Sequence, residues 1–221
     1  MNSFEMPRAD HRTLILGSTG SGKTTVGAWL LSHAPFHTMP YVIIDYKRDK
    51  LLNSIDRSIP IGLNELPDKP GLYHLRPNPI SDDDAMENWL LKVWHKRNIG
   101  LYIDEALRIP ANRTGAFEAI QTQGRALRIP TISLSQRPVS LNRFAFSEAN
   151  HVVALRLTDR RDRKTVSEYV PIDYDAERLP EYHSRWYNVE KNRLFVVRPV
   201  PRAEEILERI RARLKPRRYT I

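Results

Sequence analysis

The sequence predicts an α/β protein with a mostly parallel, doubly wound sheet, and two observations support this fold class. Short apolar segments alternate along the chain with longer stretches of helical periodicity, which is the order of β/α units. Three of these segments lead directly into Gly17, Asp45 and Asp104, and a fourth leads into Gln136. Ligands bind beyond the carboxyl ends of the strands in such sheets, so these residues are candidates for one shared site.

The predicted strands are short and largely apolar, as expected for strands covered on both faces. They occupy residues 13–16, 41–44, 99–103, 131–135 and 151–155. Helices are expected between them, at about residues 23–33, 82–96, 114–127 and 160–169. The proline-bearing stretch 59–79 is interpreted as an irregular crossing with one short strand at 72–75.

The C-terminal part has a different pattern. After Pro180, residues 184–189 and 193–197 are expected to form a hairpin, followed by an arginine-rich helix at about residues 201–214. We therefore expect a main domain at residues 1–180. Residues 181–221 would form a hairpin and a basic helix or tail that packs on this domain or extends from it.

Composition points to a polyanionic partner. The chain has 221 residues, enough for one α/β domain with a tail. Its 35 Lys and Arg against 26 Asp and Glu give a net charge of +9. Nucleic acid is the commonest partner of such a chain, although a merely solvated basic surface explains the same charge. With no Cys, no export signal in residues 1–10 and no apolar run near the ~20 residues of a membrane span, we expect a cytoplasmic protein.

The strongest motif is a glycine-rich loop between the first predicted strand and the first predicted helix. The segment Gly17-Ser-Thr-Gly-Ser-Gly-Lys23-Thr24 fits the P-loop pattern G-x-x-x-x-G-K-[ST] in its required context. Backbone N–H groups of such a loop point at phosphates, and the helix start adds partial positive charge. We expect ATP there, with Lys23 between the phosphates and Thr24 as a ligand of Mg²⁺. The expected nucleotide-binding residues are Gly17, Ser18, Thr19, Gly20, Ser21, Gly22, Lys23, Thr24 and Thr25.

Two acidic residues follow the third predicted strand. Asp104 can hold Mg²⁺ through water, and Glu105 is placed to polarise the attacking water. A solvated strand end explains such a pair when it stands alone, but after a P-loop a hydrolytic role is favoured. Gln136, at the end of the next strand, can orient the water or respond to the γ-phosphate, with a solvated strand end as its alternative.

Three further segments stand out beside the P-loop and the acidic pair: Asp45-Tyr-Lys47, Gly124-Arg-Ala-Leu-Arg-Ile-Pro-Thr-Ile-Ser-Leu-Ser-Gln-Arg-Pro138 and Ala149-Asn-His-Val-Val-Ala-Leu-Arg156. In order and spacing, the five motifs resemble those of the FtsK–HerA superfamily of DNA-pumping ATPases over about residues 12–168. Tyr46 departs from the pattern, because the superfamily often has Pro there. The resemblance implies a RecA-like P-loop NTPase with an additional-strand catalytic glutamate, formed by residues 1–180.

Within that superfamily, the chain is most similar to the genome-packaging ATPases of tailless viruses with an internal membrane. We expect no N-terminal barrel, membrane anchor or large inserted domain, which distinguish other members. The resemblance implies an ATP-hydrolysing motor that translocates double-stranded DNA and packages a viral genome into a preformed capsid. Viral capsid or membrane portal proteins are candidate partners, and the implied location is the host cytoplasm or the virion vertex.

Arg125 matches a position from which relatives reach the nucleotide of the neighbouring subunit. A guanidinium there stabilises charge on the γ-phosphoryl group, an effect of ~10³–10⁵ in rate. A residue supplied by a neighbour implies a closed ring, and the resemblance implies a hexamer. The alternative for Arg125 is a cap at the carboxyl end of its helix, and Arg156 is a second candidate for the catalytic role.

Other functions stay open at this stage. They are a cellular DNA translocase of repair, segregation or conjugation, a nucleotide-binding switch without motor activity, and a small-molecule nucleotide kinase. Glu105 argues against the switch.

The aromatic pair Trp186 and Tyr187 is a candidate partner contact. Two basic clusters are candidate DNA contacts, although solvated arginines explain them equally: Arg160, Arg161, Arg163 and Lys164, and Arg209, Arg211, Arg213, Lys215, Arg217 and Arg218.

Overall fold

The fold is described by a computed structural model that covers residues 4–109, 115–174 and 178–214. Thr114, the first residue of one predicted helix, lies outside the described residues. So do Lys215, Arg217 and Arg218 of the basic tail. Within the described ranges, no helix combines the length and the apolar character that crossing a bilayer requires.

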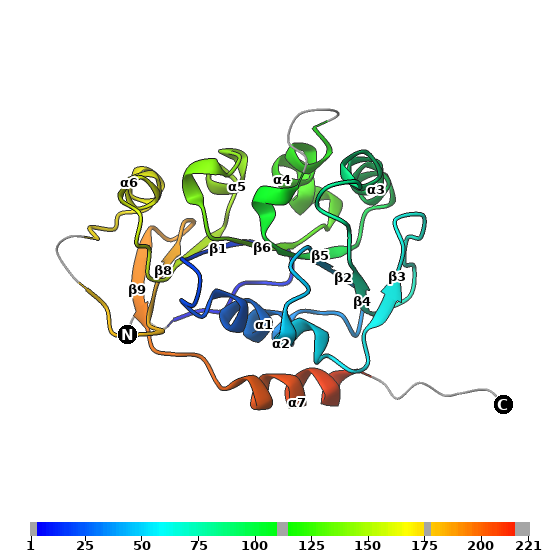
Figure 1. The fold of residues 1–221 in the computed structure, drawn as a ribbon, viewed down its shortest axis with the longest axis horizontal. Helices are drawn as coiled ribbons and strands as arrows, with labels where there is room; N and C mark the ends of the chain where they lie inside the picture. The colour runs from blue at the N-terminus through cyan, green and yellow to red at the C-terminus, as the bar shows by residue number, and fades with distance from the viewer. Residues whose placement is uncertain (1–3, 110–114, 175–177, 215–221) are drawn as a thin grey trace.

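A nine-stranded sheet forms the centre of the described fold (Figure 1). Its strands are β1 Arg12–Leu16, β2 Pro40–Asp45, β3 Ile59–Ile61, β4 Gly71–Leu75, β5 Gly100–Asp104, β6 Thr131–Ser135, β7 His151–Ala154, β8 Ser184–Asn188 and β9 Arg193–Val197. Their order is β3-β4-β2-β5-β6-β1-β7-β8-β9. Strands β1 to β7 pair in parallel, whereas β8 and β9 are antiparallel additions at one edge. The mostly parallel sheet and the C-terminal hairpin are as predicted.

Helices cover both faces of this sheet, which confirms the doubly wound arrangement. They are α1 Lys23–His33, α2 Lys50–Asn53, α3 Asp83–Lys96, α4 Ala116–Leu127, α5 Phe144–Ser147, α6 Arg160–Tyr169 and α7 Ala203–Arg213. Helices α3 to α6 lie on one face, and α1, α2 and α7 lie on the other (Figure 1). Helix α7 packs on α1 and so closes the second layer from outside.

The side chains of the central strands serve both layers, because successive residues of a strand point to opposite faces. Ile15 of β1 packs in the cluster that includes α1 and α7, whereas Leu14 and Leu16 pack in the cluster under α5 and α6. Burial on both faces explains why these strands are almost continuously apolar. It also holds the carboxyl ends of β5, β6, β1 and β7 side by side at one edge.

The sequence did not predict the one-turn helix α5, and it did not predict α2 and β3 either. Helix α2 is one turn long, and Asp49 caps it by accepting a hydrogen bond from Leu51 N at 2.8 Å. Strand β3 has three residues, includes Pro60 and pairs with β4 at the edge of the sheet. Neither is long enough to show a periodic pattern, and proline is tolerated only on such an edge strand.

The interpretation of Trp186 and Tyr187 as a partner contact is wrong, because both side chains are buried. Trp186 lies in the core cluster that contains α1 and α7. Its Nε1 donates a hydrogen bond to His151 Nδ1 at 3.0 Å. The aromatic pair therefore joins the hairpin to the sheet instead of facing outward.

Candidate nucleotide site

The P-loop connects the carboxyl end of β1 to the amino end of α1. Gly20 and Gly22 have φ angles of 74° and 90°, values that side chains other than glycine rarely tolerate. They turn the chain so that α1 begins at Lys23 without any side-chain cap and without an acidic residue in its first turn. The N–H groups of a helix start have no intrahelical partner, so this helix end is prepared for an anion.

Neighbouring strands hold the loop in place. Gly17 N donates to the carbonyl of Ser135 at 3.2 Å, and Ser18 N donates to the carbonyl of Arg156 at 2.9 Å. A Cβ at Gly17 would collide with the Ser21 hydroxyl. The Ser21 Oγ is itself buried without a hydrogen-bond partner among the described residues. The loop is thus preformed, and it presents one unused polar atom.

Lys23 is buried in this cradle, with 6% of its surface exposed. Burial lowers the pKa of its ammonium group, and the positive charge of Lys47 lowers that pKa further. A phosphate placed at the P-loop would counter both effects, because its negative charge favours the protonated ammonium group.

Asp104 is the last residue of β5 and Glu105 follows it, and β6 lies between β5 and the P-loop strand β1. Asp104 is fully buried, and neither of its carboxylate oxygens has a hydrogen-bond partner among the described residues. Burial raises its pKa to about 6, although Lys47 opposes the shift. Unpartnered carboxylate oxygens beside a phosphate cradle suit a hard cation such as Mg²⁺. The described residues contain no group of three or more His, Cys, Asp or Glu that could hold a metal ion, so phosphate and water oxygens would complete the set.

Glu105 is buried but engaged at both oxygens. Its backbone has φ 80° and ψ 70°, an unusual left-handed conformation that turns the chain after β5. Its Oε1 accepts hydrogen bonds from Ser135 Oγ at 3.2 Å and Gln136 N at 3.3 Å. Its Oε2 forms an ion pair with Lys47 Nζ. Glu105 is therefore fixed by groups from β6 and from the segment after β2.

Gln136 lies between the acidic pair and the loop. Its side-chain Oε1 accepts a hydrogen bond from Thr19 Oγ1 at 2.9 Å, and its backbone N–H donates to Glu105. The predicted residues from Gly17 to Thr25, together with Asp104, Glu105 and Gln136, therefore come together at one edge of the sheet. A group at the end of β6 in this position can respond both to the loop and to Glu105.

Arg125 lies at the opposite edge. It sits on the last turn of α4, before β6 begins, whereas Gln136 follows the end of β6. The five residues of β6 separate the two edges by ~16 Å at about 3.3 Å per residue. Arg125 Nε instead lies 3.5 Å from Asp10 Oδ2, and the side chain is half exposed. The structure thus does not bring Arg125 to the P-loop of its own chain, whereas Arg156 lines a hollow beside it with Ser18 and Thr19.

Lys47 and Tyr182 are site residues that the sequence analysis did not single out for a role. Lys47 appeared only as part of a resembling motif, and its contact with Glu105 depends on the pairing of β2 with β5. Tyr182 lies in a turn far along the chain from the P-loop, yet its ring is the group that a Cβ added at Gly22 would meet first. No local sequence pattern indicates either contact.

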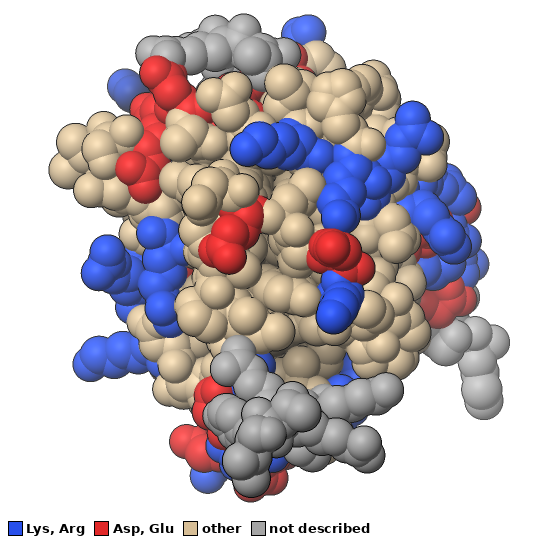
Figure 2. Space-filling view, turned by 90° about the vertical axis from the view of Figure 1, so that its right-hand side faces the viewer, with Lys and Arg blue, Asp and Glu red and all other residues tan. Residues whose placement is uncertain are grey.

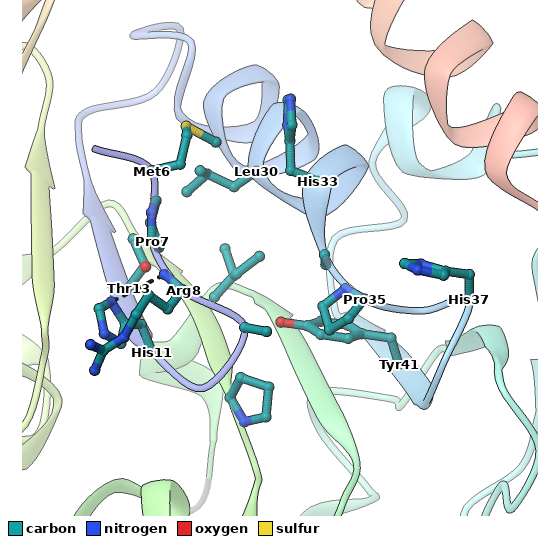
Figure 3. Close-up of a pocket in the computed structure, with 14 residues that line it drawn as sticks. Met6, Pro7, Arg8, His11, Thr13, Leu30, His33, Pro35, His37 and Tyr41 are labelled. Atoms are coloured by element: carbon teal, nitrogen blue, oxygen red, sulfur yellow. Dashed lines mark hydrogen bonds between the residues drawn. The ribbon is translucent and has the colours of Figure 1, made fainter. Parts of the chain in front are cut away.

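A separate pocket of about 120 Å³ lies at the amino edge of the sheet (Figure 3). Its lining includes Met6, Thr13, Leu30 and Tyr41, from the N-terminal segment, β1, α1 and β2. The backbone N–H of Arg8 donates to His11 Nδ1 at 3.2 Å across its rim. Because the P-loop lies at the other edge, this pocket is not part of the nucleotide site.

The P-loop, the acidic pair after β5 and the inserted strand β6 define a RecA-like P-loop NTPase of the additional-strand class. No protein-family model matches the chain. The DNA packaging ATPase P9 of Enterobacteria phage PRD1 is 40% identical to it over 216 residues, which cover 94% of this chain and 95% of P9. The chain belongs to the family of that packaging ATPase.

Solved structures agree on the fold. The genome packaging NTPase B204 of Sulfolobus turreted icosahedral virus 2, solved with sulfate, has a TM-score of 0.71 at 16% identity, covering 88% of this chain and 99% of B204. The pCW3 conjugation coupling protein TcpA, solved with ATPγS, has a TM-score of 0.60 at 15% identity, covering 90% of this chain and 64% of TcpA. At these identities the likeness concerns the fold alone.

Proposed function

We propose that the chain is an ATP-hydrolysing motor that moves double-stranded DNA and packages a viral genome into a preformed capsid. The observation that carries this proposal is the relationship to P9, a DNA packaging ATPase, over nearly the whole length of both chains. The site supports hydrolysis independently, because an unpartnered carboxylate and a second, positioned carboxylate lie beside a preformed P-loop. Structures of B204 with ATPγS and AMPPCP support ATP as the nucleotide.

In this proposal the P-loop N–H groups and Lys23 bind the phosphates. Thr24 and Asp104 would hold Mg²⁺, which would supply positive charge to neutralise the phosphates. The two unpartnered oxygens of buried Asp104 support this assignment.

Glu105 would accept the proton of the attacking water, and Gln136 would position that water or respond to the γ-phosphate. Lys47 occupies the second oxygen of Glu105, so turnover requires that this ion pair loosen. An incoming γ-phosphate offers Lys47 another anion, because Lys47 is close enough to perturb both Lys23 and Asp104.

Arg125 would act on the nucleotide of the next subunit. Its place at the amino edge of the sheet, half exposed and remote from its own P-loop, supports a head-to-tail contact in which one subunit's amino edge faces another's carboxyl edge. Such a heterologous contact closes into a ring, which we propose to be a hexamer. Arg156 is the weaker candidate, because it lies beside the P-loop of its own chain.

DNA and capsid proteins are the proposed partners. The net charge of +9 supports DNA binding. On the face at the β3 edge, Lys and Arg side chains gather toward the two sides, and Asp and Glu side chains lie among the uncharged residues between them (Figure 2). The arginines of α7 are engaged within the chain, since Arg211 pairs with Asp56 at 3.2 Å and Arg213 lies over the ring of Phe36. In the cluster on α6, the exposed Arg160, Arg161 and Lys164 are therefore the better candidates for phosphate contacts, whereas Arg163 Nη1 donates to the carbonyl of Thr158 at 3.1 Å.

Phosphate release measured on the wild-type chain and on Lys23→Ala tests the enzymatic part of the proposal. Lys23→Ala should lose ATP binding and turnover, because the loop loses its buried positive charge. A nucleotide kinase is the competing enzyme. Transfer of the γ-phosphate to a nucleoside monophosphate, at a rate comparable to release into water, would replace the motor with that activity.

A further inference from the structure

The residues at the carboxyl ends of the central strands determine the direction in which a bound nucleotide lies. Glu105 and Gln136 follow β5 and β6, so the γ-phosphate belongs on that side of the P-loop. The nucleoside must then leave the loop on the opposite side, where β7 is the neighbour of β1. The strand order thus identifies the side of the nucleotide site, next to β7, that the base and ribose would contact; this side is called the wall below.

That wall contains a turn from the C-terminal part of the chain. A pocket there is lined by Gly20, Ser21, Arg156 and residues 179–182. The turn is closed by a hydrogen bond from His183 N to the carbonyl of Pro180 at 3.2 Å. It is held near the loop because β8, which begins at Ser184, pairs with β7.

Tyr182 is the outstanding residue of this turn. Its side chain is 56% exposed, although its ring lies against the P-loop. A Cβ built on Gly22 would be 3.0 Å from Tyr182 Cδ1. Its φ of 61° is left-handed, a conformation that a bulky residue rarely adopts and that often marks a functional position. The fold therefore keeps an aromatic face open to solvent directly beside the phosphate cradle.

We propose that residues 179–183 form the nucleoside subsite, with the base of the nucleotide stacked on the ring of Tyr182. This inference rests on the proposed binding of ATP at the P-loop and adds the part of the site that holds the base. An exposed aromatic ring binds a base through its π-face. Arg156, on the same wall, contributes a cation near the phosphates and ribose. Stacking tolerates different bases but favours the larger purines.

The test compares ligands that share the phosphates and differ in the nucleoside. Equilibrium binding of ATP and of inorganic tripolyphosphate, both with Mg²⁺, is measured by calorimetry on the full chain and on Tyr182→Ala, Tyr182→Phe and Tyr182→Trp. Stacking on an aromatic side chain is lost in Tyr182→Ala, so ATP binding should weaken about fivefold or more. Tripolyphosphate binding should be unchanged, and the Phe and Trp variants should bind ATP like the wild type.

Each other outcome has a distinct meaning. Equal weakening of ATP and tripolyphosphate would show that Tyr182 shapes the P-loop, and unchanged ATP binding in Tyr182→Ala would show that the base lies elsewhere; both overturn the inference. Tyr169→Ala, which removes another exposed tyrosine, is the matched control and should leave both ligands unaffected. A wild-type chain that binds neither ligand would overturn the proposed function itself, and with it this subsite.

Discussion

At the scale of single residues, two adjacent carboxylates have different surroundings. Asp104 is buried with both oxygens unpartnered among the described residues, whereas Glu105 is held by Ser135, Gln136 and Lys47. Environments that differ in this way give two carboxyl groups separate tasks. Here the unpartnered carboxylate of Asp104 suits the binding of a cation, and the carboxylate of Glu105, which is held in place, suits the acceptance of a proton.

Replacement of Glu105 by Gln should separate binding from hydrolysis. The carboxamide keeps the shape of the side chain but cannot take up the proton of water, so kcat should fall at least ~10²-fold while ATP still binds. Steady-state phosphate release and equilibrium ATP binding measure the two effects. Glu208→Gln, on the exposed side of α7, is the matched control; turnover in Glu105→Gln equal to that control would remove Glu105 from the mechanism.

Asp104 should destabilise the metal-free protein at neutral pH. Its pKa is raised from 3.8 to about 6 by burial, so the folded state binds a proton more tightly than the unfolded state. Stability therefore falls as the pH rises through that interval, by at most roughly 3 kcal/mol. Asp104→Asn should be more stable than wild type at pH 8 without Mg²⁺, and the advantage should shrink below pH 6. Thermal unfolding across pH measures this; a constant difference would contradict the burial argument.

At the scale of elements, the sequence identified what is periodic or carries a motif. The bounds of α1, α6, β6 and β9 match their predicted ranges; the P-loop motif marks the start of α1, and α6 is amphipathic. Strand β3 and helix α2 were missed because pairing partners and a cap define them. The P-loop and acidic pair were recognisable from spacing. The contacts of Lys47 and Tyr182 were not, since they arise only when β2 pairs with β5 and the hairpin joins β7.

The junction of β1, β7 and β8 contains a buried histidine pair that should make the fold sensitive to acid. Trp186 Nε1 can only donate, so His151 Nδ1 accepts and His151 Nε2 donates to His11 Nδ1 at 3.0 Å. Burial, and the neighbouring charge of His11, lower the pKa of His151 from 6.5 to about 4. The His151 imidazole thus binds a proton less readily in the folded state than in the unfolded state. The free energy of unfolding therefore falls by roughly 3 kcal/mol as the pH falls from 6.5 toward 4.

Denaturant unfolding of wild type and His151→Gln between pH 4 and 7.5 measures this effect. The variant should lose stability less steeply over that interval, although it starts lower. Asp104 contributes with the opposite sign below pH 6, but that contribution is common to both proteins and cancels in the comparison. Parallel pH profiles would mean that His151 is not the group responsible.

At the scale of the whole molecule, we propose that an arginine from a second copy of the chain completes the site. The carboxyl edge of the sheet holds the P-loop, Asp104, Glu105 and Gln136, while Arg125 projects from the amino edge. In this proposal one chain carries both halves of a contact that it cannot make with itself. This polarity is the structural basis for proposing a ring.

Mixing two inactive variants should restore activity if Arg125 acts across that contact. Arg125→Ala should keep ATP binding and lose turnover, because its charge matters mainly in the transition state. In rings that mix Arg125→Ala with Glu105→Gln, some interfaces pair an intact Glu105 with an intact Arg125. The rate of phosphate release should then peak at intermediate mixing ratios. A flat, inactive profile from rings shown to be mixed would place Arg125 in a structural role.

The central claim is that ATP hydrolysis moves the chain along duplex DNA, and displacement of a triplex-forming oligonucleotide from duplex DNA tests it most directly. The wild-type chain should displace the third strand when ATP and Mg²⁺ are present, and phosphate release should rise when duplex is added. Displacement should vanish in Glu105→Gln and weaken with salt, because the DNA contacts are to phosphates. Phosphate release that ignores DNA, together with no displacement by rings that bind the duplex, would contradict the assignment of a DNA motor.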